Sequence, residues 1–122
     1  MMFTEKRSFY RILLLVFIMI LFSACSRVSD EEIKAARSAV QKGAIILDVR
    51  TVKEHREKHI EGSVNIPIQY LDRLYTRIPR DKEIVVYCRT GSRSSVAAEF
   101  LRKEGWKVYD VASQEDWERK IK

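Results

Sequence analysis

The sequence has little of what holds together a chain that lacks a packed core. It contains only two cysteines, four glycines and two prolines in 122 residues. Two cysteines close at most one bridge, which excludes a disulfide-dense secreted scaffold. The low glycine and proline contents, with 46% hydrophobic and 33% charged residues, exclude collagen-like and low-complexity chains. This composition and length predict one small globular domain.

The sequence also lacks an apolar run long enough to cross a membrane comfortably. Its longest run, Ile12–Phe22, has 11 residues. As a helix it would extend about 16 Å, against the ~30 Å hydrocarbon core of a bilayer. Three basic residues precede the run, and the small residues Ser23 and Ala24 follow it. This order is typical of a secretory signal peptide, which we expect to occupy residues 1–24.

Cys25 directly follows the small residues. The segment Leu21–Cys25 (LFSAC) resembles the lipobox of bacterial lipoproteins, although Phe22 stands where that motif usually has leucine. The resemblance implies cleavage behind Ala24, acylation of Cys25 and a polar tether over residues 25–29. The domain would then be exported and anchored by lipid, in the periplasm or at the cell surface. An uncleaved signal anchor and a buried cysteine in a cytosolic protein are the alternatives.

Positive charge is in excess but is not clustered. A chain that begins at Cys25 keeps 20 of the 23 basic and 16 of the 17 acidic residues, a net charge of +4. Basic and acidic residues alternate along most segments, without the basic patch and interleaved aromatics of a nucleic-acid site. We therefore expect no nucleic-acid partner. The excess charge favours a small anionic substrate or an anionic lipid surface.

Residues 30–122 alternate between helix and strand signals. Ser29 and Thr51 each begin a capping box, and Ser113 caps a last helix that carries Trp117 and Ile121. Apolar runs predict strands at 44–49, 63–66, 83–88 and 106–111. Apolar spacing predicts the remaining helices, with Ile33, Ala36 and Val40 in the first, Tyr70, Leu71, Leu74 and Ile78 in another, and Val96, Ala97, Phe100 and Leu101 in a third. The pattern predicts an α/β sandwich with a largely parallel sheet, whose binding edge follows the carboxyl ends of the strands.

One loop at that edge carries the reactive residue types. Cys88 ends a predicted strand, and a helix begins a few residues later. Unpaired amides at a helix start, turned inward by Gly91, would form an anion-binding nest. Arg89, Arg93 and the helix dipole are expected to lower the pKa of Cys88 and make it a nucleophile. The candidate binding residues are Arg89, Thr90, Gly91, Ser92, Arg93 and Ser94.

Structural roles without catalysis or donor binding are the alternative interpretations for these residues. Cys88 could be a small hydrophobe at the end of a buried strand, but that would not explain two arginines and a glycine beside it. Arg89 could be a solvated charge, whereas Arg93, nearer the helix start, is the better pocket residue. Asp48, Arg50 and Glu54 are expected to support loops through hydrogen bonds and ion pairs rather than to react. The two histidines are too few for a zinc site.

Three ordered motifs within residues 44–117 resemble the single-domain rhodaneses, which are sulfurtransferases. Leu47–Arg50 (LDVR) is similar to their first signature, and Glu54 with His59–Pro67 (HIEGSVNIP) to the next segment. Val85–Ser94 (VVYCRTGSRS) is similar to their active-site loop. This chain departs from the family with His55 in an aromatic position, Lys58 in a glycine position and Ala112–Ser113 in place of a glycine pair.

The resemblance implies a three-layer α/β sandwich over residues 30–122 and a Cys88 persulfide. Thiosulfate or a related small anion would donate sulfane sulfur, and a thiol or cyanide would accept it, with no cofactor and in a monomer. A cysteine phosphatase is the rival enzyme, but its loop has one residue more than the four between Cys88 and Arg93, and histidine where Tyr87 stands. A lipid-tethered rhodanese-like module that binds a partner or senses redox state without catalysis is the alternative function.

Overall fold

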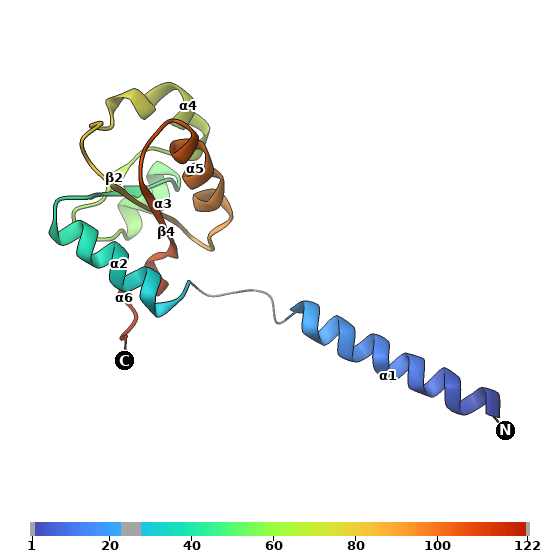
Figure 1. The fold of residues 1–122 in the computed structure, drawn as a ribbon. Coiled ribbons are helices and arrows are strands. Elements are labelled where there is room, and N and C mark those ends of the chain that lie inside the picture. The colour runs from blue at the N-terminus through green and yellow to red at the C-terminus, as the bar shows by residue number, and fades with distance from the viewer. Residues whose placement is uncertain (1, 23–27, 122) are drawn as a thin grey trace.

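A computed structural model describes residues 2–22 and 28–121 (Figure 1). Among them, helix α1 spans Met2–Phe22 and precedes the α/β domain. The domain contains four strands, β1 (Ile45–Asp48), β2 (Val64–Asn65), β3 (Ile84–Cys88) and β4 (Val108–Ser113). Its helices are α2 (Asp30–Gln41), α3 (Val52–Glu57), α4 (Leu71–Leu74), α5 (Ser92–Lys103) and α6 (Gln114–Glu118), with short 3₁₀ turns η1 (Ile68–Tyr70) and η2 (Tyr75–Arg77).

The strands form one sheet in the order β2-β1-β3-β4, and every neighbouring pair is parallel. Parallel strands need crossover connections, and α3, α4 and α5 lie in these crossovers along the chain. The carboxyl ends of β1 and β3 therefore meet at one edge, with Asp48 opposite Tyr87. The expected α/β sandwich with a small parallel sheet is confirmed.

Helices cover both faces of the sheet (Figure 1). Alternate residues of β3 enter different cores, because successive side chains on a strand point to opposite faces. Ile84 and Val86 pack with α4 and α5, while Val85 and Tyr87 pack with α2. All four are fully buried, which accounts for a strand that is apolar at every position.

Local hydrogen bonds begin three of the helices as expected. Both the Ser29 and the Thr51 capping boxes are complete. The Ser113 hydroxyl accepts from the amide of Asp116 at 3.1 Å. These caps satisfy amides that have no partner within their own helix, so the neighbouring residues alone are enough to specify them.

The prediction of one continuous helix through Tyr70, Leu74 and Ile78 is wrong. The segment instead forms η1, α4 and η2 in succession. Tyr70 is exposed, and Ile78 is buried but extended (ψ 126°). Pro79 disfavours helical backbone at the residue before it, so Ile78 reaches the core from outside the helix.

The apolar stripe expected on α5 also needs correction. Val96 is 59% exposed, whereas Ser94 and Ala98 are buried with Ala97 and Leu101. The buried face of α5 therefore runs along Ser94, Ala97, Ala98 and Leu101 and does not include Val96. On α2, Ile33 and Ala36 are buried as expected. Ala39 is also buried, whereas Val40, expected in the apolar stripe, is only half-buried.

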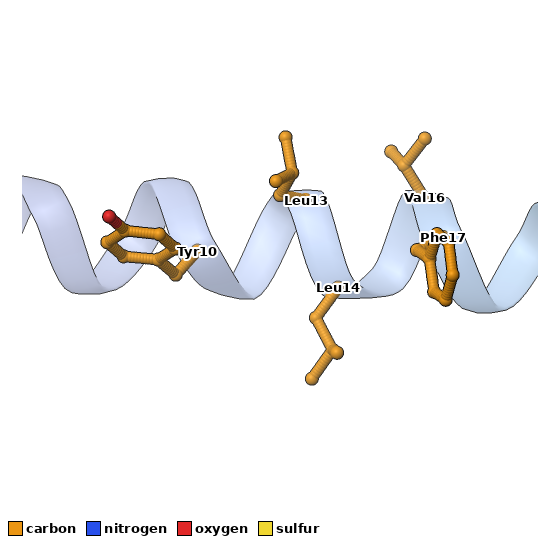
Figure 2. A pocket seen from close by; sticks show the side chains of 5 residues that line it. All are labelled: Tyr10, Leu13, Leu14, Val16 and Phe17. Carbon is orange, nitrogen blue, oxygen red and sulfur yellow. The ribbon is translucent and has the colours of Figure 1, made fainter.

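Helix α1 begins well before the apolar run that the signal-peptide prediction used. None of the described helices combines the length and apolar character that crossing a membrane requires. Figure 2 shows side chains around a hollow on this single helix, and none of them is a predicted site residue. Cys25 and the predicted cleavage position behind Ala24 lie outside the described residues.

Candidate active site

Cys88 is the last residue of β3, and three loop residues separate it from α5. Gly91 is the N-cap of α5 with φ 101°, a left-handed conformation that favours glycine. This conformation directs the Gly91 amide at the Cys88 sulfur, with 3.0 Å between N and Sγ. The cysteine is 1% exposed, so almost none of its surface reaches solvent.

Burial raises the pKa of the Cys88 thiol, but hydrogen bonds lower it by a larger amount, so the net pKa lies below its ordinary value. The amide and hydroxyl of Ser94 contribute most to this lowering of the pKa, followed by the amides of Gly91 and Thr90. Hydrogen bonds stabilise the thiolate because they are made to its charge. The direction of the shift agrees with the sequence analysis, but the loop and Ser94, rather than the arginines, lead the lowering.

Arg89 of the loop and Arg93 in the first turn of α5 both point to a carboxylate on α3. The Arg93 guanidinium forms a bidentate pair with Glu54, at 2.8 Å (Nη1 to Oε2) and 3.0 Å (Nη2 to Oε1). Arg89 Nε donates to Glu54 Oε1 at 3.0 Å. The Arg89 side chain is 61% exposed and that of Arg93 31%, so Arg93 is the more enclosed of the two.

Glu54 is therefore part of the loop's immediate surroundings. Its Oε2 also accepts from the amide of Thr51 at 2.9 Å and from the Thr51 hydroxyl at 3.1 Å, within the capping box of α3. The hydrogen bond from Arg93 is the main reason that the pKa of Glu54 lies far below its ordinary value. These hydrogen bonds favour the ionised carboxylate over its protonated form.

Asp48 and Arg50 form a buried ion pair beside the loop, at the end of β1. Arg50 donates from Nε and Nη2 to the two oxygens of Asp48 at 2.9 and 2.7 Å. The Tyr87 hydroxyl donates to Asp48 Oδ2 at 3.0 Å and accepts from the amide of Ile60 at 3.1 Å. The network connects β1, β3 and the segment before β2, which are the supports of the Cys88 loop.

The residues that depart from the family pattern fit this network. His55 places Nδ1 2.9 Å from Asp48 Oδ2, and its ring stacks on His59 with 4.0 Å between centroids. Lys58 has φ −162°, extended backbone that any residue adopts, and its carbonyl accepts from Arg50. Among the described residues, no group of three or more His, Cys, Asp or Glu side chains is placed to hold a metal ion.

Ala112 forms a wall of the loop from β4. Ala112 has φ 60°, and a Cβ placed on Gly91 would lie 3.1 Å from the Cβ of Ala112. The register between β3 and β4 shifts here, because Cys88 pairs with Ser113 while Val86 pairs with Asp110. The Asp110 carboxylate accepts from the Ala112 amide at 2.9 Å and supports this left-handed turn. Glycine is therefore needed at 91, where any side chain would crowd Ala112.

Sequence reasoning missed two contributors to the site, Tyr87 and His55, and it did not anticipate the burial of Ser94. Ser94 was expected to bind the donor, but it is fully buried, and its hydroxyl donates to the Gly91 carbonyl at 3.2 Å. The Tyr87 hydroxyl and His55 were not assigned to the Asp48 network. Thr90 and Ser92 lie exposed around the loop. The alternation of β3 could have identified Tyr87, since its side chain must leave the sheet opposite to that of Cys88.

Comparison with known proteins identifies the family to which the domain belongs. The profile of the rhodanese-like domain matches residues 31–119. A sulfurtransferase of Allochromatium vinosum is 30% identical over 77 residues, which cover 63% of this chain and 72% of that protein. A putative sulfur carrier protein of Bacillus subtilis, YrkF, is 35% identical over 74 residues, 59% of this chain and 40% of that one.

A solved structure shares both fold and sequence. Reduced CoADR-RHD of Bacillus anthracis superposes with a TM-score of 0.62 at 34% identity, over 75% of this chain and 16% of that one. This chain thus spans less than half of the Bacillus subtilis relative and a small part of CoADR-RHD. The matched profile covers most of the domain, including the Cys88 loop and the Asp48 network. The chain belongs to the family of rhodanese-like domains, which includes sulfurtransferases.

Proposed function

We propose that the domain is a sulfurtransferase in which Cys88 carries sulfane sulfur from thiosulfate, or a related small anionic donor, to a thiol or cyanide. The observation that supports this most is the thiol itself. Its pKa lies below the ordinary value, and the Gly91 amide is 3.0 Å from Sγ. A thiolate is the nucleophilic form of cysteine, and here it needs no neighbouring base.

The proposed reaction has two steps. In the first, the Cys88 thiolate attacks the outer sulfur of thiosulfate, a new sulfur–sulfur bond forms, and sulfite leaves with the electron pair of the broken bond. In the second, a thiolate or cyanide attacks the outer sulfur of the Cys88 persulfide, and the Cys88 thiolate leaves. Protons balance because every attacking and leaving group is an anion.

The loop stabilises the charge in both steps. The persulfide carries its negative charge on the outer sulfur, next to the amides that follow Cys88. Preorganised amides at a helix start stabilise such an anion without reorganising, as an oxyanion hole does for oxygen. Because the loop leaves Cys88 only 1% exposed, a donor must present a narrow terminal sulfur to reach Sγ.

Mass spectrometry of the intact protein tests the first step. After treatment with thiosulfate and removal of excess donor, we expect a gain of one sulfur, about 32 Da, located on the peptide that contains Cys88. Addition of cyanide should remove this mass and release thiocyanate. A protein that gains no mass, or gains it at another residue, would contradict the proposal.

We also propose that residues 1–24 direct export and that acylated Cys25 anchors the domain to a membrane. The support is a basic start followed by a short apolar segment, whose described side chains Ile12–Ile18 are each at least 42% exposed. Cys25→Ala should abolish labelling by a fatty-acid analogue and processing of the lipoprotein type, with Cys88→Ala as the matched control. An unlabelled wild-type protein cut at another position would contradict this assignment.

A further inference from the structure

The Glu54 carboxylate uses the groups of Arg93 that would otherwise bind an oxyanion. A guanidinium binds carboxylates and other planar or tetrahedral oxyanions with two parallel N–H groups. In this protein both such groups of Arg93 donate to Glu54. Nε of Arg89 donates to the same carboxylate. An incoming donor therefore meets arginines that an internal anion already occupies.

This arrangement also changes the charge that a donor encounters. Arg89 and Arg93 would together contribute two positive charges beside Cys88, and Glu54 reduces their sum to one. Five hydrogen bonds, from the two arginines and from Thr51, hold the carboxylate in this position, and its side chain is 16% exposed. Charge partly shielded from water acts more strongly than at an open surface.

We infer that Glu54 sets the charge selectivity of the donor site, shifting it away from donors of charge −2 and toward donors of charge −1. This inference rests on the proposed sulfur transfer at Cys88. A site of reduced positive charge still attracts an anion, but it gains less from the second charge of a dianion. Glu54 is thus a positioning residue, which acts through the arginines and does not react.

Two donors of similar size and different charge test the inference in the full chain. Thiosulfate is a dianion and methanethiosulfonate a monoanion, and both deliver a terminal sulfur, with sulfite or methanesulfinate leaving. The measurement is kcat/KM for thiosulfate divided by kcat/KM for methanethiosulfonate. The fraction of folded enzyme cancels in this ratio, so a partly unfolded variant still gives a valid result.

Glu54→Gln should raise the ratio about three- to tenfold, because one negative charge is removed near the donor. Glutamine also serves at the third position of a capping box, so α3 keeps its start. Glu57→Gln is the matched control, since Glu57 lies on the same helix with a 60% exposed side chain and pairs with Lys53. It should leave the ratio unchanged.

Further measurements separate charge from lost contacts. Glu54→Asp keeps the charge and shortens the side chain, so its ratio should stay near that of the wild type. About 1 M salt should shrink the difference between Glu54→Gln and wild type, because screening then acts within ~3 Å. An unchanged or lower ratio in Glu54→Gln, or a Glu54→Asp ratio equal to that of Glu54→Gln, would overturn the inference and leave sulfur transfer standing. Failure of both donors to load Cys88 in the wild type would overturn both.

Discussion

Cys88→Ser should abolish sulfur transfer, with a loss of at least about a thousandfold, while the domain keeps its fold. Serine is close to cysteine in size and can still accept from the Gly91 amide, which now approaches Sγ at 3.0 Å. Its hydroxyl, however, does not ionise near neutral pH and cannot form a persulfide. Thiocyanate release from thiosulfate and cyanide measures the activity, and thermal unfolding measures the fold.

The chain's other cysteine provides the matched control. Cys25→Ser in purified protein should retain full transfer, because Cys25 precedes the matched domain. In the wild type, the rate of persulfide formation should rise with pH, with its midpoint below the ordinary thiol pKa, since the pKa of Cys88 is lowered. Transfer that survives in Cys88→Ser would show that another group accepts the sulfur.

Asp48→Asn should destabilise the domain by about 3–5 kcal/mol, the cost of leaving one partner of a buried ion pair uncompensated. Asp48 is fully buried and Arg50 is 7% exposed, so water cannot replace the lost charge. The asparagine amide would also direct N–H groups at a guanidinium that itself only donates. Urea unfolding, monitored by circular dichroism, gives the change in free energy.

An exposed aspartate gives the comparison. Asp72→Asn removes a carboxylate that is 69% exposed and whose Oδ1 lies as far as 3.9 Å from Arg73 Nε. Its effect should therefore stay within about 0.5 kcal/mol. A loss of less than about 1 kcal/mol in Asp48→Asn would mean that Arg50 finds another acceptor.

The pH dependence of stability provides a second measurement on Asp48. Burial raises the pKa of Asp48, but hydrogen bonds from Arg50, His55 and Tyr87 lower it to below its ordinary value. A carboxylate with a lowered folded pKa stabilises the protein above its unfolded pKa, about 3.9, and loses this contribution as the pH falls through the folded value. Asp48→Asn should lack that part of the acid-induced loss.

The features that depend on neighbouring residues could be predicted from the sequence. The capping boxes of Ser29 and Thr51 require only four consecutive residues, and both occur in the structure. The strands could be recognised from their apolar runs, and alternation with helices implied a parallel sheet. The position of Cys88 at a strand end before a helix also followed from local pattern.

The partners of the site residues were decided by the tertiary structure. Glu54 meets Arg89 and Arg93 across 35 and 39 residues of chain, and Tyr87 meets Asp48 across 39. The same three charges in a sequence are compatible with two arginines that face a donor or two that face a carboxylate. Which of these occurs depends on where the crossover places α3 relative to the loop.

The sequence by itself therefore determined the class of fold, the capped helix starts and the place of Cys88 at the end of a strand, because each depends on interactions within a few residues. Only the tertiary structure decided which backbone and side-chain groups lower the pKa of Cys88 and how much positive charge surrounds it. The buried face of α5 includes the polar Ser94 and leaves the apolar Val96 exposed, which the apolar spacing alone did not indicate. Hydrogen bonds and ion pairs act over a few ångströms, so they respond to packing that brings distant segments together, and local pattern does not contain that information.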